Sequence, residues 1–164
     1  MAVENKYVSA NLAANLPEHA LLAGGAAAKL IVASVEIAAA DDNNSIYRFA
    51  KGISSDRRLV RAEVVNDAIT GGTDYDFGVY KGLDDGGDVI DKDALADGLS
   101  MASARAVGSA VSLMSAVDQA DLGKPIYELA GESEGSRTHK VDLALTANVV
   151  GTAAGTITVL MEFA

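Results

Sequence analysis

The two histidines are the first place to look for catalysis, because imidazole is the side chain that most readily exchanges protons near neutral pH. They are His19 and His139, and Asp142 lies close to His139 in the sequence. Serines are plentiful, so a serine–histidine–aspartate site is conceivable. We predict no nucleophile elbow of the G-x-S-x-G type, which is the strand–serine–helix turn of many hydrolases. We therefore interpret His139 as a solvent-exposed loop residue.

An acidic, glycine-rich segment, Asp84–Asp97, offers the oxygen ligands that hard cations such as Ca²⁺ prefer. Its spacing does not fit an EF-hand, because Leu95 stands where a third acidic ligand would follow Asp91 and Asp93. No glutamate is well placed to complete the loop. We interpret the segment as a solvated loop and predict no metal, with calcium binding as the open alternative.

The sequence also lacks the residues that other kinds of catalytic or cofactor-binding site require. There is no cysteine, which excludes disulfides, thiol catalysis and thiolate metal sites. The glycine pairs Gly24-Gly25 and Gly71-Gly72 do not match a phosphate-binding loop. Paired carboxylates for glycoside hydrolysis work in clefts lined by aromatics, and this chain has five Tyr, three Phe and no Trp. We predict no catalytic residue and no cofactor, and we expect a protein that is not an enzyme.

Charge and composition narrow the choice of partners. The net charge of −10 disfavours nucleic acid, since phosphate binding needs clustered Lys and Arg. The apolar run 20–40 is interrupted by Lys29, Glu36 and a glycine pair, so no transmembrane span is expected. The first residues lack the pattern of a signal peptide. Many apolar residues are alanine, which bury little area each, so association with identical copies is expected to add stability.

Alternation of apolar and polar residues predicts strands over most of the chain. The segments are Lys29–Ala40, Ser45–Gly52, two strands within Arg57–Lys81 joined by a turn at Thr70–Thr73, Lys140–Val150 and Thr156–Phe163. The side chains expected to face the core include Ile31, Val35, Ile37, Tyr47, Phe49, Arg58, Val60, Ala62, Val64, Tyr75, Phe77, Val79, Val141, Leu143, Leu145, Ala147, Val149, Ile157, Val159, Met161 and Phe163. Strands that follow one another are predicted to pair as three hairpins.

Helical signals are few. Pro125 suits the first turn of a short helix that Gly131 ends. Asp91–Ala96 is predicted to make one helical turn, and Leu99–Ser115 is ambiguous between helix and irregular structure. Without strand–helix–strand alternation, we predict an all-β fold: an antiparallel β-sandwich of jelly-roll type with one short helix.

The chain is predicted to divide into an N-terminal arm, 1–28, and a single β-sandwich domain, 29–164. The first segment shows no sustained period, so it is either a terminus without stable structure or an arm that lies on a partner. Candidate contact residues in it are Tyr7, Leu12 and Leu16.

Arg57, Arg58 and Arg61 form the densest positive charge in the chain. They either pair with Glu63 on a solvated face or bind an acidic partner, and we name them as further candidates for a capsid or subunit contact.

Four segments, in this order, resemble the small head decoration, or cement, proteins of tailed bacteriophages. They are NDAITGGTDYDFGVY at Asn66–Tyr80, DKDALADG at Asp91–Gly98, DLGKPIYELAG at Asp121–Gly131, and GTITV at Gly155–Val159. The resemblance covers roughly residues 29–164.

The resemblance implies a jelly-roll-like fold that sits outside the capsid as dimers or trimers and clamps neighbouring major capsid subunits against the pressure of internal DNA. It implies a virion location on the capsid surface after synthesis in the host cytoplasm, and it brings no catalytic residues. Two alternatives stay open: a tail or spike component, and a jelly-roll carbohydrate-binding module.

Overall fold

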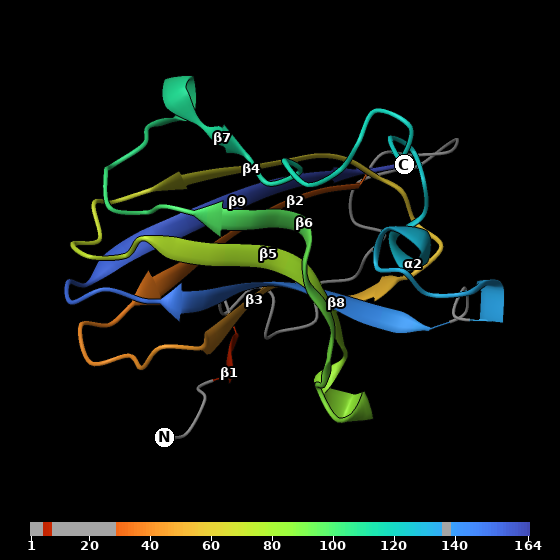
Figure 1. Ribbon diagram of the computed structural model, residues 1–164, viewed down its shortest axis with the longest axis horizontal. Helices are drawn as coiled ribbons and strands as arrows, with labels where there is room; N and C mark the ends of the chain where they lie inside the picture. Colours follow the sequence, from red (N-terminus) through yellow and green to blue (C-terminus); the bar gives the residue numbers. More distant parts are fainter. Residues whose placement is uncertain (1–4, 8–28, 136–138) are drawn as a thin grey trace.

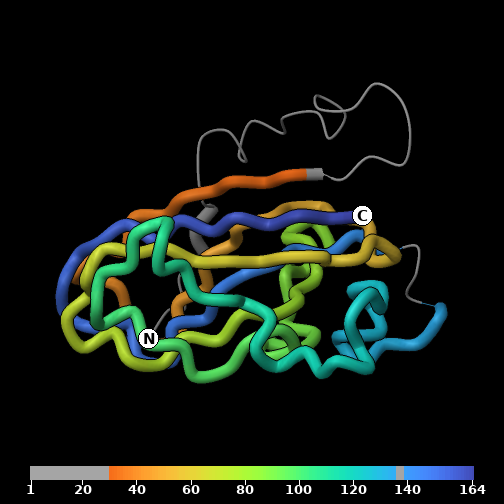
Figure 2. The backbone as a smooth tube through the Cα atoms, turned by 90° about the horizontal axis from the view of Figure 1, so that it is seen from above, coloured from red at the N-terminus to blue at the C-terminus, as the bar shows by residue number. Residues whose placement is uncertain are grey.

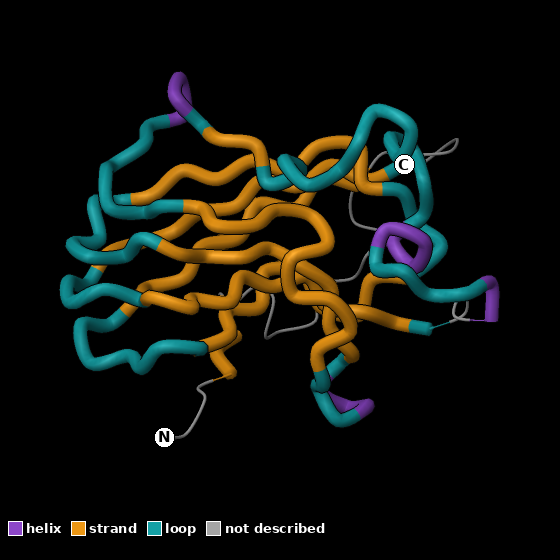
Figure 3. Tube along the Cα trace, in the orientation of Figure 1, coloured by secondary structure: helices purple, strands orange, loops and turns teal. Residues whose placement is uncertain are grey.

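The computed structural model describes residues 5–7, 29–135 and 139–164 (Figure 1). Its strands are β1 (Asn5–Tyr7), β2 (Lys29–Ile37), β3 (Ser45–Ser54), β4 (Leu59–Asn66), β5 (Asp74–Lys81), β6 (Val89–Leu99), β7 (Val111–Ser112), β8 (Lys140–Val149) and β9 (Gly155–Phe163). The helical elements are two single 3₁₀ turns, η1 (Leu83–Asp85) and η2 (Val107–Ser109), and the helix α2 (Ile126–Leu129). Strands dominate this part of the chain (Figure 3).

The strands β2 to β9 fold back on one another as a long antiparallel ribbon. In it β2 pairs with β9, β3 with β8, β4 with β7, and β5 with β6. The ribbon is rolled into two packed sheets: the β2 sheet, of order β2–β9–β4–β7, and the β3 sheet, of order β1–β3–β8–β5–β6. This is the jelly-roll arrangement, and it confirms the predicted fold class. One pair departs from it, since β1 lies parallel to β3.

The three predicted hairpins are wrong. β2 and β3, β4 and β5, and β8 and β9 lie in opposite sheets in each case, so the turns between them cross the sandwich. Periodicity shows that a strand has one buried face. The same pattern arises whether the next strand lies beside it or across the core, which is why the sequence misassigned the partners.

Two of these crossing turns pack together at one end of the sandwich, on the left of Figure 1. The backbone N–H of Thr152 donates to the carbonyl of Thr70 at 2.8 Å. Gly151 has a φ of +92°, and a Cβ there would lie 2.6 Å from that carbonyl oxygen. A glycine is therefore required at this position for both its backbone conformation and the close contact.

The core lies between the two sheets, which Figure 2 shows as separate layers. Most of the predicted inward residues are buried, and β9 follows the expected alternation: Ile157, Val159, Met161 and Phe163 are fully buried. The exceptions are few. Val149 is exposed near the end of β8.

A bulge near the start of β4 corrects the predicted faces there. Leu59 pairs with Phe163 and Arg61 with Glu162, so two steps on β4 match one step on β9. The inward residue is therefore Leu59, whereas Val60 is 53% exposed and Arg58 is exposed. An extra residue in one strand shifts every later side chain, which restores the predicted inward positions from Ala62 onward.

The predicted helical turn at Asp91–Ala96 is also wrong, because these residues belong to β6. β6 pairs with β5 through three register shifts. Its backbone crosses closely over Gly78 of β5, where a Cβ would lie 2.1 Å from the carbonyl oxygen of Asp91. Leu99–Ser115 is mostly irregular, with η2 and the short β7.

The short helix α2 is confirmed at its predicted place. It begins directly after Pro125, and Gly131 has a φ of +71° beyond its end. The backbone N–H of Ile126 donates to the carbonyl of Arg57, and that of Tyr127 to Ser55, so the helix closes one end of the sandwich. Most of the predicted arm, 8–28, lies outside the described residues, and the proposed division into arm and domain stays a prediction.

Candidate interaction surface

The three arginines named from the sequence lie near the start of β4 but do not form one strip. Arg61 is 55% exposed on the outer face of the β2 sheet, where its guanidinium contacts the Glu63 carboxylate at 2.7 Å. Arg58 lines a shallow hollow with Asp56, Pro125, Tyr127 and Glu128.

Arg57 is partly buried, and its backbone bonds to Ser54 and to α2. Among the described residues, only Arg61 of the three forms a salt bridge. Of the pairings with Glu63 that the sequence suggested, the structure shows that of Arg61, which lies two residues away on the same strand, β4.

The arm residues are only partly placed. The backbone of Tyr7 lies in β1, opposite Arg48 of β3. Leu12 and Leu16 lie outside the described residues. Their role as contacts stays a prediction.

The outer face of the β2 sheet carries apolar side chains where a solvent-facing sheet normally carries polar ones. Leu30 is 47% exposed and Val32 57% exposed. Val32 lies opposite the partly exposed Leu160 of β9, and Leu30 opposite Glu162. We define the exposed apolar strip as Leu30, Val32 and Leu160. Val60 on β4 is also exposed, but Glu162 of β9 lies between it and Leu30. Such strips mark contact surfaces more often than isolated apolar residues do.

Sequence reasoning missed this strip, although a signal for it exists. Within Lys29–Ala40 the inward set is Ile31, Ala33, Val35 and Ile37, so the intervening positions should be polar. Ser34 and Glu36 are polar, but Leu30 and Val32 are not. Apolar residues on both faces of one strand are the sequence signal by which this exposed strip could have been found.

The outer face of the β3 sheet differs, because it carries a buried polar cluster. Arg48 and Asp142 are fully buried and form an ion pair at 2.8 Å. The guanidinium also donates to the carbonyls of Lys81, at 2.9 Å, and Gly87, at 2.7 Å. It lies 5.3 Å from the ring centre of Tyr80. Arg48 thereby holds the loop that contains η1 against the sheet.

A second polar group surrounds Asp76 on the same face. Its carboxylate accepts hydrogen bonds from Asn148 at 2.7 Å and from the Gly98 N–H at 3.1 Å, and it pairs with Lys92 at 3.0 Å. Burial acts to raise the pKa of Asp76, but these hydrogen bonds outweigh it, so the pKa lies below its ordinary value. The hydrogen bond to Asp76 likewise raises the pKa of Lys92.

Asp76 is expected to make part of the stability depend on pH. A carboxyl whose pKa is lower in the folded state stabilises above its unfolded pKa of about 3.9, and that contribution is lost as the pH falls through the folded pKa. Asp76→Asn should therefore unfold more easily than wild type at neutral pH, by about 1–3 kcal/mol. The difference should shrink towards about pH 3.

Urea titrations of both proteins across this pH range test the expectation. Asp84→Asn, which removes one negative charge at an exposed site, is the control. A gap between Asp76→Asn and wild type that does not change with pH would contradict it.

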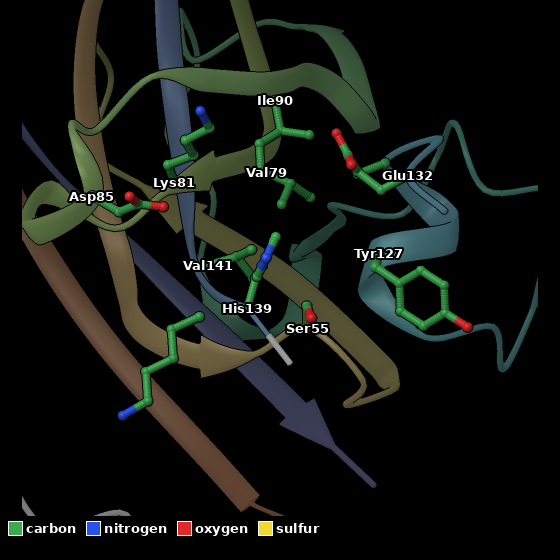
Figure 4. A pocket seen from close by; sticks show the side chains of 11 residues that line it. Ser55, Val79, Lys81, Asp85, Ile90, Tyr127, Glu132, His139 and Val141 are labelled. Carbon is green, nitrogen blue, oxygen red and sulfur yellow. The ribbon is translucent and has the colours of Figure 1, made fainter. Parts of the chain in front are cut away.

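A cavity of about 320 Å³ opens at the end of the sandwich near α2 (Figure 4). Its apolar side comes from the core residues Val79 and Val141, together with Ile90. Charged residues of both signs surround it, namely Lys81, Lys140, Asp85 and Glu132, and His139 also lines it. Figure 4 shows the Tyr127 ring directed away from this space, in keeping with the hydrogen bond from its hydroxyl to Glu128. The cavity is thus the open end of the hydrophobic core, and charged residues of both signs lie around its rim.

The letters G-x-S-x-G do occur, at Gly131–Gly135, but they do not build a nucleophile elbow. An elbow places its serine between a strand and a following helix, whereas Ser133 is exposed in the loop that follows α2. His139 is exposed, as expected, and His19 lies outside the described residues.

No group of three or more metal-binding side chains gathers anywhere in the described ranges, the acidic Asp84–Asp97 segment included. No helix within those ranges has the length and apolar character needed to cross a membrane.

Comparison with known proteins gives one structural resemblance to report. No family model matches the sequence, and no curated protein does. A chain in the capsid asymmetric unit of the cyanophage Pam1 aligns with 90% of this chain and 95% of its own length, at 14% identity and a TM-score of 0.46. At this identity no residue of that chain assigns a role to a residue here.

Proposed function

We propose that this chain is a non-enzymatic structural protein of a phage virion, which binds the outside of the capsid as a homo-oligomer and contacts major capsid subunits. The observation that carries the proposal is the exposed apolar strip on the outer face of the β2 sheet. Exposed apolar side chains such as Leu30 and Val32 do not stabilise a sheet face that stays in water. They do stabilise the contact when a partner covers that face. The order of sequence motifs that resembles phage decoration proteins supports it.

The use of polar groups in this fold also supports a structural role. Two groups of buried polar side chains, around Arg48 and Asp76, form their ion pairs and hydrogen bonds with the chain's own strands and loops. Polar side chains that bond to one another and to the backbone within the scaffold hold its parts together.

The carbohydrate-binding alternative is disfavoured by the placement of the aromatic rings. Sugar recognition of that kind needs a ring face open to solvent. The aromatic side chains that the structure describes are all buried: Tyr47, Phe49, Tyr75, Phe77, Tyr80, Tyr127 and Phe163.

Capsid binding and the predicted role of the arm can be tested together. The double variant Leu12→Ser, Leu16→Ser keeps the full chain and leaves the segment of β1 unaltered. We expect it to bind heads that lack the protein roughly tenfold more weakly than wild type, equivalent to about 1.4 kcal/mol, because two candidate apolar contacts are lost. Co-sedimentation with such heads measures the affinity.

Leu122→Ser is the matched control, since Leu122 is 60% exposed and is not a candidate contact. Unchanged binding by the double variant would refute the role of the arm. Absence of binding by the wild-type protein would refute the proposed function itself.

A further inference from the structure

Three side chains from neighbouring strands of the β3 sheet meet over β5. Lys92 comes from β6, Asp76 from β5 and Asn148 from β8, and β5 lies between the other two strands. The Lys92 amine lies 3.0 Å from Oδ2 of Asp76 and donates to the side-chain oxygen of Asn148 at 2.9 Å. Nδ2 of Asn148 donates to the same Oδ2 of Asp76 at 2.7 Å. An amine, an amide and a carboxylate are therefore in mutual contact.

The chemistry that these three groups can perform together is amide transfer. An uncharged lysine amine is a nucleophile, and the side-chain amide of asparagine is a carbonyl centre that can release its nitrogen as ammonia. A carboxylate that contacts both nitrogens can move protons between them. An ion pair needs only the lysine and the carboxylate, so the position of the amide is what distinguishes this cluster.

The amide carbon of Asn148 lies within reach of the amine. A carbonyl bond is about 1.2 Å long, so this carbon, Cγ, is at most about 4 Å from Nζ of Lys92. Reacting atoms in a near-attack arrangement are about 3–3.5 Å apart. The Lys92 side chain is 47% exposed, so rotation about its bonds can supply the remaining shift of about 1 Å.

Asp76 and Asn148 are both held in place by further hydrogen bonds. The Asp76 side chain is 2% exposed, and its Oδ1 accepts from the backbone N–H of Gly98 at 3.1 Å. Nδ2 of Asn148 also donates to Oδ1 of Asp74 at 3.2 Å. One oxygen of Asp76 contacts both the attacking nitrogen and the nitrogen that would leave. A proton taken from the first nitrogen is therefore already beside the second.

We propose that Lys92 and Asn148 join in an isopeptide bond, with Asp76 as the catalytic residue that transfers the protons. A bond forms between Nζ of Lys92 and Cγ of Asn148, and the bond from Cγ to Nδ2 breaks. Asp76 carries two protons, one after the other, from Nζ to the leaving nitrogen, which departs as ammonium. One lysine ammonium and one primary amide thus become one secondary amide and one ammonium ion, and Asp76 is regenerated.

The bond would connect β6 to β8 across β5, between residues 56 positions apart in the sequence. A covalent cross-link stabilises a fold mainly by restricting the unfolded chain. β6 is the strand whose pairing with β5 is interrupted by three register shifts, so it would gain most from such a link. The chain has no cysteine from which a disulfide could be made instead.

The charge of the amine governs the rate of the reaction. The hydrogen bond to Asp76 raises the pKa of Lys92, and the nearby Asp93 and Tyr80 act in the same direction. Little of the amine is therefore uncharged at neutral pH, and the ion pair described above is the starting state. The uncharged fraction grows about tenfold for each pH unit below this pKa, so mild alkali should speed the reaction.

Intact mass spectrometry of the purified full-length protein tests the proposal, before and after incubation at about pH 9. Wild type, a chain of 16.8 kDa, is expected to fall below its sequence mass by about 17 Da, the mass of one ammonia. Lys92→Arg keeps a positive charge beside Asp76 but has no nucleophilic amine, so it should show its full sequence mass. Asp76→Asn should do the same. Lys124→Arg is the matched control and should keep the loss, because Lys124 pairs with Asp121 at an exposed site.

Peptide mapping distinguishes this bond from another loss of ammonia, the cyclisation of an asparagine onto its own backbone. Trypsin does not cut after an acylated lysine, so the linked chain should give a branched peptide that joins residues 82–105 to 141–164. Cyclisation would leave the two peptides separate.

Three results would overturn the proposed bond. They are a folded wild-type protein that keeps its full sequence mass after the alkaline incubation, a loss of ammonia that Lys92→Arg shares, and a loss without the branched peptide. Full linking in Asp76→Asn would overturn the role of Asp76. None of these measurements involves capsids, so their outcome is independent of the proposed function.

Discussion

Replacing Asp142 with alanine is expected to lower the free energy of unfolding by about 3–5 kcal/mol. The substitution leaves the fully buried guanidinium of Arg48 without its carboxylate partner, which lies 2.8 Å away. It also leaves the backbone N–H of Gly52 without the oxygen that it contacts at 2.8 Å. When one partner of a buried ion pair is removed, the other charge stays unpaired in a low-dielectric environment. The free-energy cost of that unpaired charge is larger than the net stabilisation that the ion pair provides. Urea unfolding followed by circular dichroism measures the difference.

The control is Glu63→Ala, which breaks the exposed pair with Arg61. That variant should lose less than about 1 kcal/mol, because exposed ion pairs contribute little. The double variant Arg48→Met, Asp142→Leu should recover much of the loss, since it removes both buried charges at similar volume. Equal losses in Asp142→Ala and Glu63→Ala would show that Arg48 is not held by this pair.

Gly78→Ala is expected to be the most damaging of the glycine-to-alanine changes within β-strands, at the upper end of roughly 1–3 kcal/mol or beyond it. A Cβ at Gly78 would lie 2.1 Å from the carbonyl oxygen of Asp91 and 2.3 Å from the carbonyl carbon of Lys92. Both atoms belong to the backbone of β6, so no side-chain rotation relieves the clash. β6 must move away from β5, and the loop that Arg48 holds through Gly87 is connected directly to it.

Gly108→Ala is the matched control for this substitution. Gly108 lies in η2, and a Cβ at this position would have no heavy atom within 4 Å. Its replacement should change the free energy of unfolding by no more than about 0.5 kcal/mol. Thermal melts and urea titrations of the two variants compare the effects. If both variants match wild type, the crossing of β6 over β5 is looser than described.

The predictable part of the fold is the part that local pattern determines. Alternation identified the buried faces of β2, β5, β8 and β9, because a side chain's face depends only on its neighbours in sequence. Strand pairing was not predictable in the same way. Whether the strand after the Thr70–Thr73 turn lies beside β4 or across the core depends on contacts between distant segments. The bulge at Val60 and the register shifts of β6 are local events with no distinct sequence signal.

The candidate interaction surface shows the same difference between features that the local sequence determines and features that depend on distant contacts. Arg61 was found from charge clustering, but its pairing with Glu63 along one strand leaves Arg57 and Arg58 in separate surroundings. Arg48 was not singled out, because its partner Asp142 is 94 residues away and nothing local indicates that either is buried. The exposure of Leu30 and Val32 could have been predicted, because both are apolar residues at positions of β2 that alternate with the inward-facing ones.

Cryo-electron microscopy of the particles assembled from the genome that encodes this chain tests the central claim most directly. The account predicts jelly-roll density on the outside of the head, at positions repeated by the capsid symmetry, in contact with neighbouring major capsid subunits. Density confined to the tail or a spike would contradict it in favour of the other virion role. Particles without this chain would contradict a structural role in the virion altogether.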